Sequence, residues 1–550
     1  MSDASRILSI NLEDYFQAAS MRRIIPGRFW PRFDLRIEKT TERALDLLDR
    51  TSAKASFFVS GWIAERCPDL VVEIARRGHD VASRGYLHRP FSEMTPEEFR
   101  SDFLRSRDAI ERASGQVVRG YRIGEGSLPA DGSQMLRILA KEGVRFDSSL
   151  RPFGPRFVGR AGKRGIHRIE GDDWAITEVP LSSSTLLGVP YPVTGGIYMR
   201  QTPDALFDHS VARRLRSDAE PWHFYFDAWE LDPEQPRVSA MSGLQRLGQY
   251  RNLETMTERV ERQLQQGRFT SIAEHLGLPV EAAAPVAAPE RASVVHVETG
   301  AVCDVTIVIP CYNEEESLPY LAGNLATLEA ATRGIYQFSY VFVDDGSRDK
   351  TWTVLNRLFA SNPNCQVVQH PKNLGIAAAT MTGIRLAKDE IVCGIDCDCS
   401  FDPHDLTRMI PLLTPGIDMV QASPYHRNGD VMNVPAWRLV LSRNLSKIYR
   451  QILTHKFSSY TACFRVYRRS AVTKITLDDG GFLGIMEIFV KLDRSGSKII
   501  EFPAVLATRL LGVSKMKTLR VIRSHLVLIA KTIRKGAAPD RSGPAHPVTG

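Results

Sequence analysis

Two aspartates separated by one residue, Asp396 and Asp398, follow an apolar run in the stretch GIDCDCSFDP at positions 394–403. Placed just past a strand end, both side chains would reach into one shallow site. Two carboxylates at that spacing can share a divalent cation and leave its other coordination positions for the oxygens of a diphosphate. The pair therefore predicts transfer from a nucleotide-activated donor. Because short acidic pairs are also common in solvated turns, the surrounding elements have to decide between the two interpretations.

The elements predicted to position this pair are strands of a parallel α/β sheet. Short apolar runs at 305–310, 338–343 and 391–395 each end in acidic or amide residues, and helix-like segments follow two of them. Ligands bind such sheets outside the carboxyl ends of the strands, which is where the acidic residues stand. After the first run, a spacing of three and four residues predicts a helix with one apolar face. The residues that carry this spacing are Leu318, Leu321, Leu325 and Leu328.

Six motifs in a fixed order give this half of the chain a family resemblance. They are PCYNE (310–314), VDDGSxD (343–349), NxG (373–375), DxD (396–398), FR (464–465) and RxxGxSK (509–515). Over residues 304–536 the sequence resembles the inverting family-two glycosyltransferases of the GT-A fold. Within that family it is most similar to the polyprenyl-phosphate sugar transferases, which are like dolichol-phosphate mannosyltransferase.

The resemblance implies a role for each motif. Asp396 and Asp398 would be the catalytic pair that holds Mg²⁺ or Mn²⁺. The acceptor, polyprenyl phosphate or a related envelope acceptor, would be gripped by a basic lip in which arginine offers paired donors and lysine a point charge. The residues implied for the nucleotide sugar are Pro310, Tyr312, Asn313, Glu314, Asp344 and Asp345. Those implied for the acceptor phosphate are Arg438, Ser442, Arg465, Arg509, Ser514 and Lys515.

Two departures from the family bear on the acceptor. Ser459 stands where related transferases commonly carry an aspartate, and Pro424 replaces an arginine usual in this branch. A phosphate acceptor is already anionic and needs little help from a general base, so losing the aspartate is tolerable for a phosphate and damaging for a hydroxyl. A processive polysaccharide synthase is disfavoured, because the QxxRW motif and the transmembrane helices of that branch are missing.

A stretch that mixes basic and apolar residues, 518–534, follows the last motif. It predicts either a helix that lies on an anionic membrane surface or a helix that packs on its own domain. The pattern alone does not separate these two interpretations. Residues 537–550 have the composition of a disordered tail.

Strand and helix patterns also alternate through the N-terminal half. Residues 7–14 and 55–60 are typical of strands, and residues 41–49 of a helix. Pro68 and Gly78 bracket another helix, with proline in its first turn and glycine just past its end. More strands are predicted near 117–122, 144–147 and 224–229. Together these units predict a (β/α) barrel whose working residues sit at the strand C-termini.

This half resembles a second family over residues 6–276, the NodB-like polysaccharide deacetylases, in the cytoplasmic branch associated with bacterial exopolysaccharide loci. The implied fold is α/β, a distorted (β/α) barrel of the NodB type. The matching pieces are LEDYF (12–16), FFVSGW (57–62), RGHDVAS (77–83), GYxH (85–88), GYR (120–122), DSS (147–149), GGIYMR (195–200) and WELDPEQPR (229–237).

The second resemblance implies a metal site that this sequence does not complete. These deacetylases hold a divalent metal with one aspartate and two histidines four residues apart, and the metal activates a water. Asp14 and His88 fit two ligand positions and Glu13 the base, but Arg84 stands at the first histidine. A guanidinium stays protonated and has no lone pair to donate. Asp227 replaces the histidine expected as general acid, and an ordinary aspartate is already ionised at pH 7.

We therefore hypothesise that the barrel has lost hydrolysis, that zinc does not bind there, and that Asp227 pairs with Arg84. The degenerate site comprises Glu13, Asp14, Arg84, His88, Arg122 and Asp227. One alternative is a bifunctional enzyme that adds and N-deacetylates an acetamido sugar. Another is a barrel that serves as a carbohydrate-binding or scaffolding module. Asp14 also has a simpler interpretation, since acidic residues at a strand end can cap the next helix.

Length and composition set the remaining expectations. A chain of 550 residues is expected to form two or more domains. The Ala/Pro-rich segment 279–303 is the predicted linker between domains at 1–278 and 304–536. Eight scattered cysteines are expected to be reduced, and a net charge of +8 without a suitable motif does not predict nucleic-acid binding. With no signal pattern and no apolar run near the roughly 20 residues that cross a bilayer, we expect a cytoplasmic protein, peripheral at the inner face of the cytoplasmic membrane.

Overall fold

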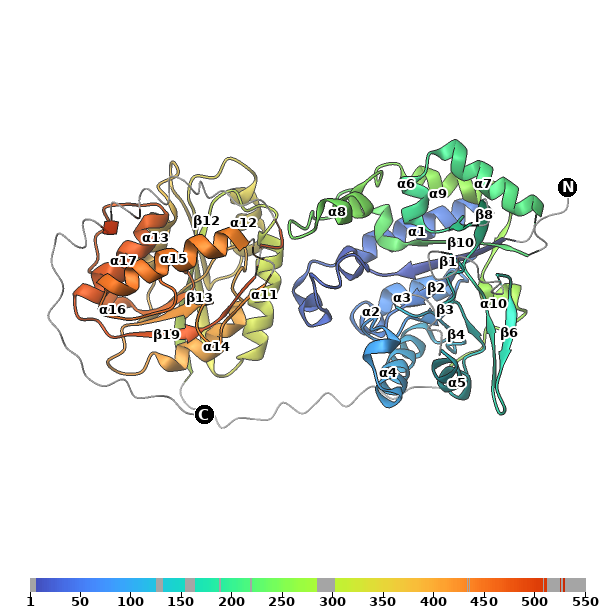
Figure 1. Cartoon of the computed structure of the whole chain (residues 1–550), viewed down its shortest axis with the longest axis horizontal. Helices are drawn as coiled ribbons and strands as arrows, with labels where there is room; N and C mark the ends of the chain where they lie inside the picture. The colour runs from blue at the N-terminus through green and yellow to red at the C-terminus, as the bar shows by residue number, and fades with distance from the viewer. Residues whose placement is uncertain are drawn as a thin grey trace. The chain divides into compact units, whose positions relative to one another are not determined.

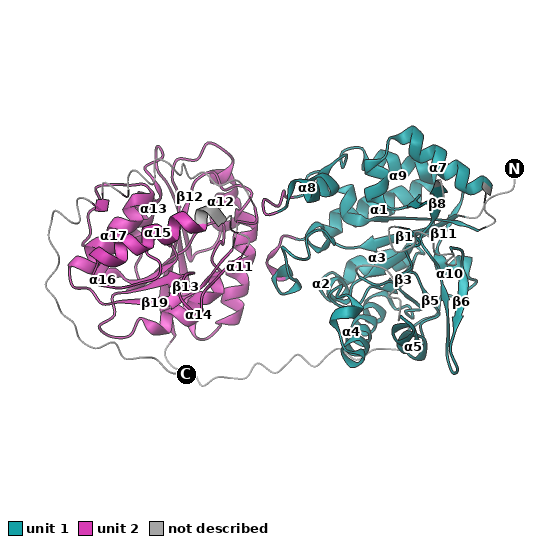
Figure 2. Ribbon diagram, in the orientation of Figure 1, with its two compact units in different colours: residues 1–30, 35–235, 241–293 teal, residues 31–34, 236–240, 294–550 magenta. Residues whose placement is uncertain are grey.

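The computed structural model describes residues 6–124, 132–153, 164–186, 189–217, 220–283, 302–432, 434, 436–507, 509–511, 525 and 528–529. It divides into two compact units, which Figure 2 colours teal and magenta. Unit 1 comprises Met1–Trp30, Leu35–Gln235 and Met241–Ser293, and unit 2 comprises Pro31–Asp34, Pro236–Ala240 and Val294–Gly550. Each unit is described by itself.

Unit 1 is built on a curled, mostly parallel sheet with the strand order β10-β1-β2-β3-β4-β5-β7-β6 (Figure 1). Strands β10 to β7 run parallel, the edge strand β6 is antiparallel to β7, and β11 also pairs with β1. Within the described ranges no pairing joins β6 to β10, so the sheet does not close into a complete barrel. The bounds are β1 Arg6–Leu12, β2 Ser56–Val59, β3 Asp80–Ser83, β4 Gly120–Tyr121, β5 Phe146–Asp147, β6 His167–Glu170, β7 Ala175–Glu178, β10 Trp222–Asp227 and β11 Phe269–Thr270. A separate hairpin pairs β8 Ser183–Leu186 with β9 Val189–Pro192.

Helices flank this sheet, and proline, capping and glycine residues stand at their ends. Helix α3 begins at Pro68, and α4 begins with a capping box of Thr95 and Glu98 and ends before Gly115. The strands are buried on both faces, because the crossover helices cover them. The bounds are α1 Ile37–Thr51, α2 Gly61–Arg66, α3 Pro68–Arg76, α4 Pro96–Ser114, α5 Ser133–Lys141, α6 Gly196–Gln201, α7 Asp204–Ser217, α8 Gly243–Tyr250, α9 Met256–Leu264 and α10 Ile272–His275.

Unit 2 contains a seven-stranded sheet in the order β14-β13-β12-β15-β18-β16-β19. The first four strands are parallel, as predicted, but β18 runs antiparallel to both β15 and β16. The sequence prediction rested on three apolar runs, which are parallel strands here, and did not include the antiparallel strand β18. The bounds are β12 Cys303–Cys311, β13 Tyr336–Asp344, β14 Cys365–Gln369, β15 Ile391–Gly394, β16 Met419–Ser423, β18 Arg465–Arg468 and β19 Ile499–Pro503, and a small ladder pairs β17 Asp430–Met432 with β20 Val505–Ala507.

Strand β12 shows how one sheet carries two apolar layers. Alternate residues along it face opposite sides, so Ile307 packs in the layer with Leu321 of α11, and Val308 packs in the layer with Ile384 of α13. The helices that form these layers and the shorter helices around them are α11 Leu318–Ala331, α12 Thr351–Phe359, α13 Ile376–Leu386, α14 Leu406–Met409, α15 Ala436–Ile452, α16 Arg469–Val472 and α17 Phe482–Arg494. The leucines predicted to share one face of α11 are all buried there.

The segment 518–534 lies mostly outside the described residues. The three that are described, His525, Leu528 and Ile529, are buried, and His525 lies 2.9 Å from the hydroxyl of Tyr449. They favour the interpretation of a segment packed on its own domain. Among the residues that the structure places, no helix is both long enough and apolar enough to cross a membrane.

Candidate functional site

The turn after β12 holds the first group of predicted nucleotide-binding residues. Pro310, Tyr312 and Asn313 are partly buried, and Asn313 adopts a left-handed φ of 51°. The carbonyl of its side chain accepts a hydrogen bond from the Arg348 amide at 2.7 Å, and its own amide donates to Ser347 at 2.8 Å. The turn after β12 is thereby tied to the turn after β13, so both motifs face the same edge of the sheet.

Asp344 and Asp345 at the end of β13 are buried and hold the neighbouring loops. Asp344 accepts from the amide of Ser347 at 3.0 Å and from the side chain of Gln369 at 2.7 Å. Asp345 accepts from two backbone amides at 2.8 Å, and its carboxylate also lies 2.8 Å from His370 Nδ1. The two amides belong to Leu374 and Gly375. These contacts set the shape of the predicted nucleotide site and use most of the carboxylate oxygens.

Gly375, in the predicted NxG motif, begins α13 in a conformation that only glycine adopts easily. Its φ is 102°, and a Cβ at this position would stand 2.4 Å from the carbonyl oxygen of Gly480. Any other residue would push the loop away and break the hydrogen bond to Asp345. The glycine of the NxG motif is therefore required by the positive φ and by the close approach of Gly480.

Asp396 and Asp398 follow β15, which is the neighbour of β12. Oδ1 of Asp398 accepts from the amide and the hydroxyl of Ser400 at 2.9 and 2.7 Å. Burial and the nearby charge of Asp398 raise the pKa of Asp396 to about 7, and a hydrogen bond from the Cys463 thiol partly offsets this rise. Sequence reasoning did not find Cys463, because no local spacing connects it to Asp396.

Arg509, predicted to grip the acceptor, lies on the carboxylates instead. Its Nε donates to Oδ2 of Asp398 at 2.8 Å, and its Nη1 and Nη2 donate to Glu314 at 3.1 and 2.9 Å. The guanidinium thus joins the turn after β12 to the turn after β15. A single positive charge here offsets two acidic side chains that the sequence assigned to donor and metal binding.

The other predicted acceptor residues do not gather around Arg509 as one group. Ser442 lies partly buried on α15. Arg438 belongs to the same helix, but its side chain, like Ser514 and Lys515, lies outside the described residues. Arg465 is fully buried in β18 and donates to the carbonyls of Ile485 and Tyr460 at 2.8 and 2.9 Å. Its placement does not support the predicted contact with an acceptor, because its guanidinium braces the core.

The carboxylates at this edge suit a hard divalent cation. Glu314, Asp396 and Asp398 offer only oxygen ligands, which Mg²⁺ and Mn²⁺ prefer. Within the described part of the chain, no group of three or more acidic, histidine or cysteine side chains is arranged to enclose a metal ion by itself. The protein would therefore supply two carboxylates, and the oxygens of a diphosphate would have to complete the coordination.

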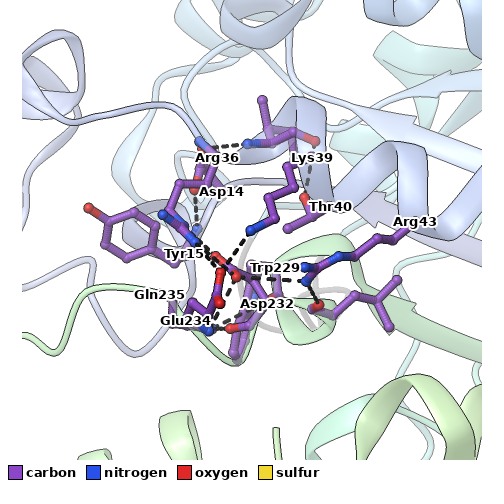
Figure 3. A network of polar contacts seen from close by, with 12 residues as sticks. Asp14, Tyr15, Arg36, Lys39, Thr40, Arg43, Trp229, Asp232, Glu234 and Gln235 are labelled. Carbon is purple, nitrogen blue, oxygen red and sulfur yellow. Dashed lines mark hydrogen bonds and ion pairs between the residues drawn. The ribbon is translucent and has the colours of Figure 1, made fainter. Parts of the chain in front are cut away.

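In unit 1, three backbone amides donate to the carboxylate of Asp14. Oδ1 accepts from Tyr15 at 2.8 Å, and Oδ2 accepts from Arg36 and Ile37 at 2.7 and 3.0 Å, at the start of α1. Figure 3 shows this contact beside the ion pair of Arg36 with Asp232. Asp14 is thus a helix cap, the simpler of the two interpretations of this residue.

Arg84, just past β3, pairs with a different partner from the one hypothesised. Its Nη2 lies 3.4 Å from Glu13 and donates to the carbonyl of Gly124 at 2.8 Å. Asp227 instead accepts from the side chain of Asn11 at 2.6 Å and shares a hydrogen bond with Glu13. The hypothesis of an Arg84–Asp227 pair was therefore wrong in its partner, because Glu13 lies closer to the guanidinium.

Buried carboxyl groups in this region hold protons more tightly than usual. Burial and the neighbouring Glu13 raise the pKa of Asp227 to about 7, and burial also raises the pKa of Glu13. His88 lies 3.3 Å from Glu13 through Nδ1, and burial together with Arg84 holds its pKa well below the usual value. Both carboxyl groups are therefore harder to ionise than they would be in water, because they are buried beside each other.

Arg122, the remaining predicted residue, braces the sheet. Its guanidinium donates to Asn11, Ser9 and Ser148, at 2.8–3.1 Å, and lies 3.9 Å from the centre of the Phe58 ring. Of the other residues of the degenerate site, Glu13 and Asp14 follow β1, Arg84 and His88 follow β3, and Asp227 ends β10.

Comparisons with known proteins match both units. The model of glycosyl transferase family 2 matches residues 306–476, the model of polysaccharide deacetylase matches 29–146, and a domain of unknown function (DUF3473) matches 148–277. The two families named from sequence and the α/β fold are confirmed by these matches.

All eight cysteines, which were expected to be reduced, are free thiols in the structure.

Individual relatives match the C-terminal part of the chain. Polyprenol monophosphomannose synthase of Mycolicibacterium smegmatis is 31% identical over 217 residues, which are 38% of this chain and 80% of that protein. Dolichol-phosphate mannosyltransferase of Pyrococcus furiosus is 29% identical over 215 residues, 39% of this chain and 59% of that protein. A solved mannosyltransferase from Pyrobaculum calidifontis, in complex with GDP-Man and Mn²⁺, is 24% identical, with a TM-score of 0.31 over 43% of this chain and 65% of its own.

Proposed function

The chain belongs to glycosyltransferase family 2, with a polysaccharide deacetylase domain ahead of the transferase, and from this premise we propose that it moves a sugar from a nucleotide-sugar donor to a polyprenyl phosphate. The observation that carries the proposal is the junction of Glu314, Arg509 and Asp398. It brings the donor motif, the metal motif and a predicted acceptor arginine to one edge of the sheet.

Each group at this junction has a defined task in the proposed transfer. Asp396 and Asp398 would hold Mg²⁺ or Mn²⁺, which would offset the charge that develops on the departing nucleoside diphosphate. The turn that contains Asn313 and the buried carboxylate of Asp344 would orient the nucleoside through hydrogen bonds. Arg509 donates to Oδ2 of Asp398, so it would compete with a cation for that oxygen. Released from Asp398, its guanidinium could pair with a phosphate.

The acceptor is a phosphate rather than a hydroxyl in this proposal. Ser459 is 2% exposed and offers no carboxylate, and its amide donates to Glu501 at 3.3 Å. Ser459 therefore supplies no general base at the position where related transferases commonly carry an aspartate. An anionic phosphate needs no such base, because it is already deprotonated at neutral pH.

Exposed apolar and basic residues on α15 support a lipid-linked acceptor. Val440, Leu441 and Ile448 expose 58%, 41% and 41% of their surface. On the same helix, Arg443, Lys447 and Arg450 are exposed and basic. A helix that combines exposed apolar residues with basic ones binds anionic lipid surfaces. We infer that α15 brings the transferase to the cytoplasmic membrane as a peripheral protein.

The experiment is a screen of labelled nucleotide sugars against a membrane extract that contains polyprenyl phosphates. Wild-type protein with Mn²⁺ is expected to label the lipid fraction from one donor, and Asp398→Asn is expected not to. Label in a water-soluble product with no label in lipid would replace polyprenyl phosphate by another acceptor. Equal lipid labelling by both proteins would overturn the assignment of Asp398.

For unit 1 we infer a saccharide-binding domain that does not hydrolyse. The support is that Asp14 is used by three backbone amides and that an arginine stands beside Glu13. The second candidate is a bifunctional enzyme, favoured by His88, whose ring nitrogens form no hydrogen bond with the described residues. Full-length protein is expected to contain no stoichiometric zinc and to release no acetate from N-acetylated oligosaccharides. Acetate release that a chelator stops would favour the second candidate.

A further inference from the structure

Arg84 is a buried cation whose hydrogen-bonding capacity is only partly used. The residue is 2% exposed, and its amide continues the sheet by donating to Val59 at 2.9 Å. One of its side-chain nitrogens, Nη2, contacts Gly124 and Glu13. The other two, Nε and Nη1, have no hydrogen-bond partner among the described residues. Donors that are buried and unpaired destabilise the fold, so a ligand that accepts from them would be bound favourably.

A second buried group with unused nitrogens stands beside the same carboxylate. His88 is 6% exposed, and its Nδ1 lies 3.3 Å from Glu13, but neither ring nitrogen forms a hydrogen bond within the part of the chain that the structure describes. Its ring is held by the edge of Trp30 at 5.6 Å, and Trp30 Nε1 is likewise unpaired there. Arg84 and His88 therefore both stand beside Glu13, and Trp30 packs against His88.

The packing of this group is fixed by the backbone. His88 adopts a left-handed φ of 54°, and a Cβ on Gly124 would stand 2.5 Å from the Cα of His88. The loop after β3 and the loop after β4 are thereby pressed together. Arg84 and His88 cannot move apart to find other partners without separating these loops.

The carboxyls in reach do not use up this donor capacity. Asp227 accepts a hydrogen bond from the side chain of Asn11 at 2.6 Å, and within the described ranges no hydrogen bond or ion pair joins it to Arg84. The only ion pair of Arg84 in the described ranges is the 3.4 Å contact with Glu13, which leaves Nε and Nη1 unused. The neighbouring cation Arg122 donates its hydrogen bonds to neutral groups of the sheet. What the site lacks is an acceptor with negative charge.

We propose that the carboxyl edge of the unit 1 sheet binds a small oxyanion, the carboxylate or phosphate of a charged saccharide, on Arg84 and His88. Hydrogen bonds between guanidinium and oxyanion are about twice as strong as neutral ones, and burial strengthens them further. A cation is excluded from the same place by the charge of Arg84. The saccharide rests on the proposed function of this domain, whereas the charge of the ligand follows from the contacts of Arg84.

The first test uses full-length wild-type protein and two ligands that differ only in charge. Glucuronate is expected to bind at least about tenfold more tightly than its neutral amide, glucuronamide, in isothermal titration calorimetry. Inorganic phosphate and glucose 6-phosphate form a second arm, which separates a carboxylate site from a phosphate site. Equal affinity for glucuronate and glucuronamide, with no binding in the phosphate arm, would overturn the proposal.

The second test locates the site. Arg84→Gln is expected to weaken the preferred anion at least about tenfold, whereas Arg213→Gln, the same change at an exposed position of α7, leaves its affinity unchanged. Should Arg84→Gln fold poorly, Arg84→Lys keeps the charge and is expected to bind with intermediate affinity. Wild-type affinity in a folded Arg84 variant would place the anion elsewhere. Asp398→Asn is expected to keep anion binding while losing transfer, so failure of this proposal is distinct from failure of the proposed transferase.

Discussion

In both units an arginine contacts acidic side chains at the carboxyl edge of a sheet, yet the two arginines are held in different ways. Arg509 makes three hydrogen bonds to Asp398 and Glu314, and its side chain keeps 18% of its surface exposed. Arg84 is part of the strand edge, keeps 3% exposed, and makes one 3.4 Å contact with a carboxylate. The first arginine pairs with two acidic side chains, whereas Nε and Nη1 of the second have no hydrogen-bond partner among the residues that the structure describes.

The acidic partners differ even more than the arginines. Oδ2 of Asp398 is held by the side chain of Arg509, and a side chain can rotate away when a cation competes. Both oxygens of Asp14 are held by backbone amides at the start of α1, which cannot leave without unravelling the helix end. A carboxylate held by a side chain can thus be released to bind a metal, whereas one that caps a helix stabilises the fold.

The largest expected effect is on transfer. Asp398→Asn removes one of two charged oxygen ligands and should lower the rate of sugar transfer by about 10²- to 10³-fold. The rate is measured with the donor found in the screen and saturating Mn²⁺. Asp478→Asn is the matched control, because its side chain is 69% exposed in the same unit. Loss of activity in both variants, or in neither, would remove Asp398 from the catalytic pair.

The next effect tests the cap in unit 1. Asp14→Ala leaves three amide donors without their acceptor and should lower the free energy of unfolding of this unit by about 2 to 3 kcal/mol. Urea unfolding followed by circular dichroism measures it, with the exposed Asp172→Ala as control. A metal ligand would behave differently: a chelator would then destabilise the wild type as much as the mutation does.

A smaller effect is expected where Arg509 competes with a cation. Arg509→Gln should raise the affinity for Mn²⁺ by roughly tenfold, since two acidic side chains lose their internal cation. Free Mn²⁺ measured by electron paramagnetic resonance, without nucleotide, reports this affinity independently of activity. Arg408→Gln, at a side chain that is 64% exposed, controls for net charge. Unchanged or weaker binding in Arg509→Gln would show that the two cations do not share these oxygens.

The smallest effect concerns pH. The pKa of Asp227 is about 7 in the folded protein, above its ordinary value near 4, because burial and Glu13 disfavour its charge. The folded state therefore binds a proton that the unfolded state has released between about pH 4 and 7, so stability falls as pH rises through this window. Asp227→Asn should make the midpoint of thermal unfolding less dependent on pH from 5 to 7. Asp172→Asn should leave the wild-type slope, and an equal slope in all three proteins would contradict the raised pKa.

Local patterns predicted most of the elements that position the two sites. The buried runs became β12, β13 and β15, and the leucine spacing became α11, because period and burial are properties of neighbouring residues. The strand predicted near 117–122 shrank to Gly120–Tyr121, and β18 was missed. Both depend on pairing partners distant in sequence, which no local pattern reports.

The sequence by itself determined the two families, the acidic residues at strand ends, and the replacement of a histidine ligand by Arg84. Only the tertiary structure decided how those charges are used: that Arg509 lies on Asp398 and Glu314, that Arg465 is buried in the core, and that Asp14 caps α1. The physical reason is that the residue type fixes the functional group of a side chain. Its hydrogen-bond partners come from distant segments that meet only when the sheet forms.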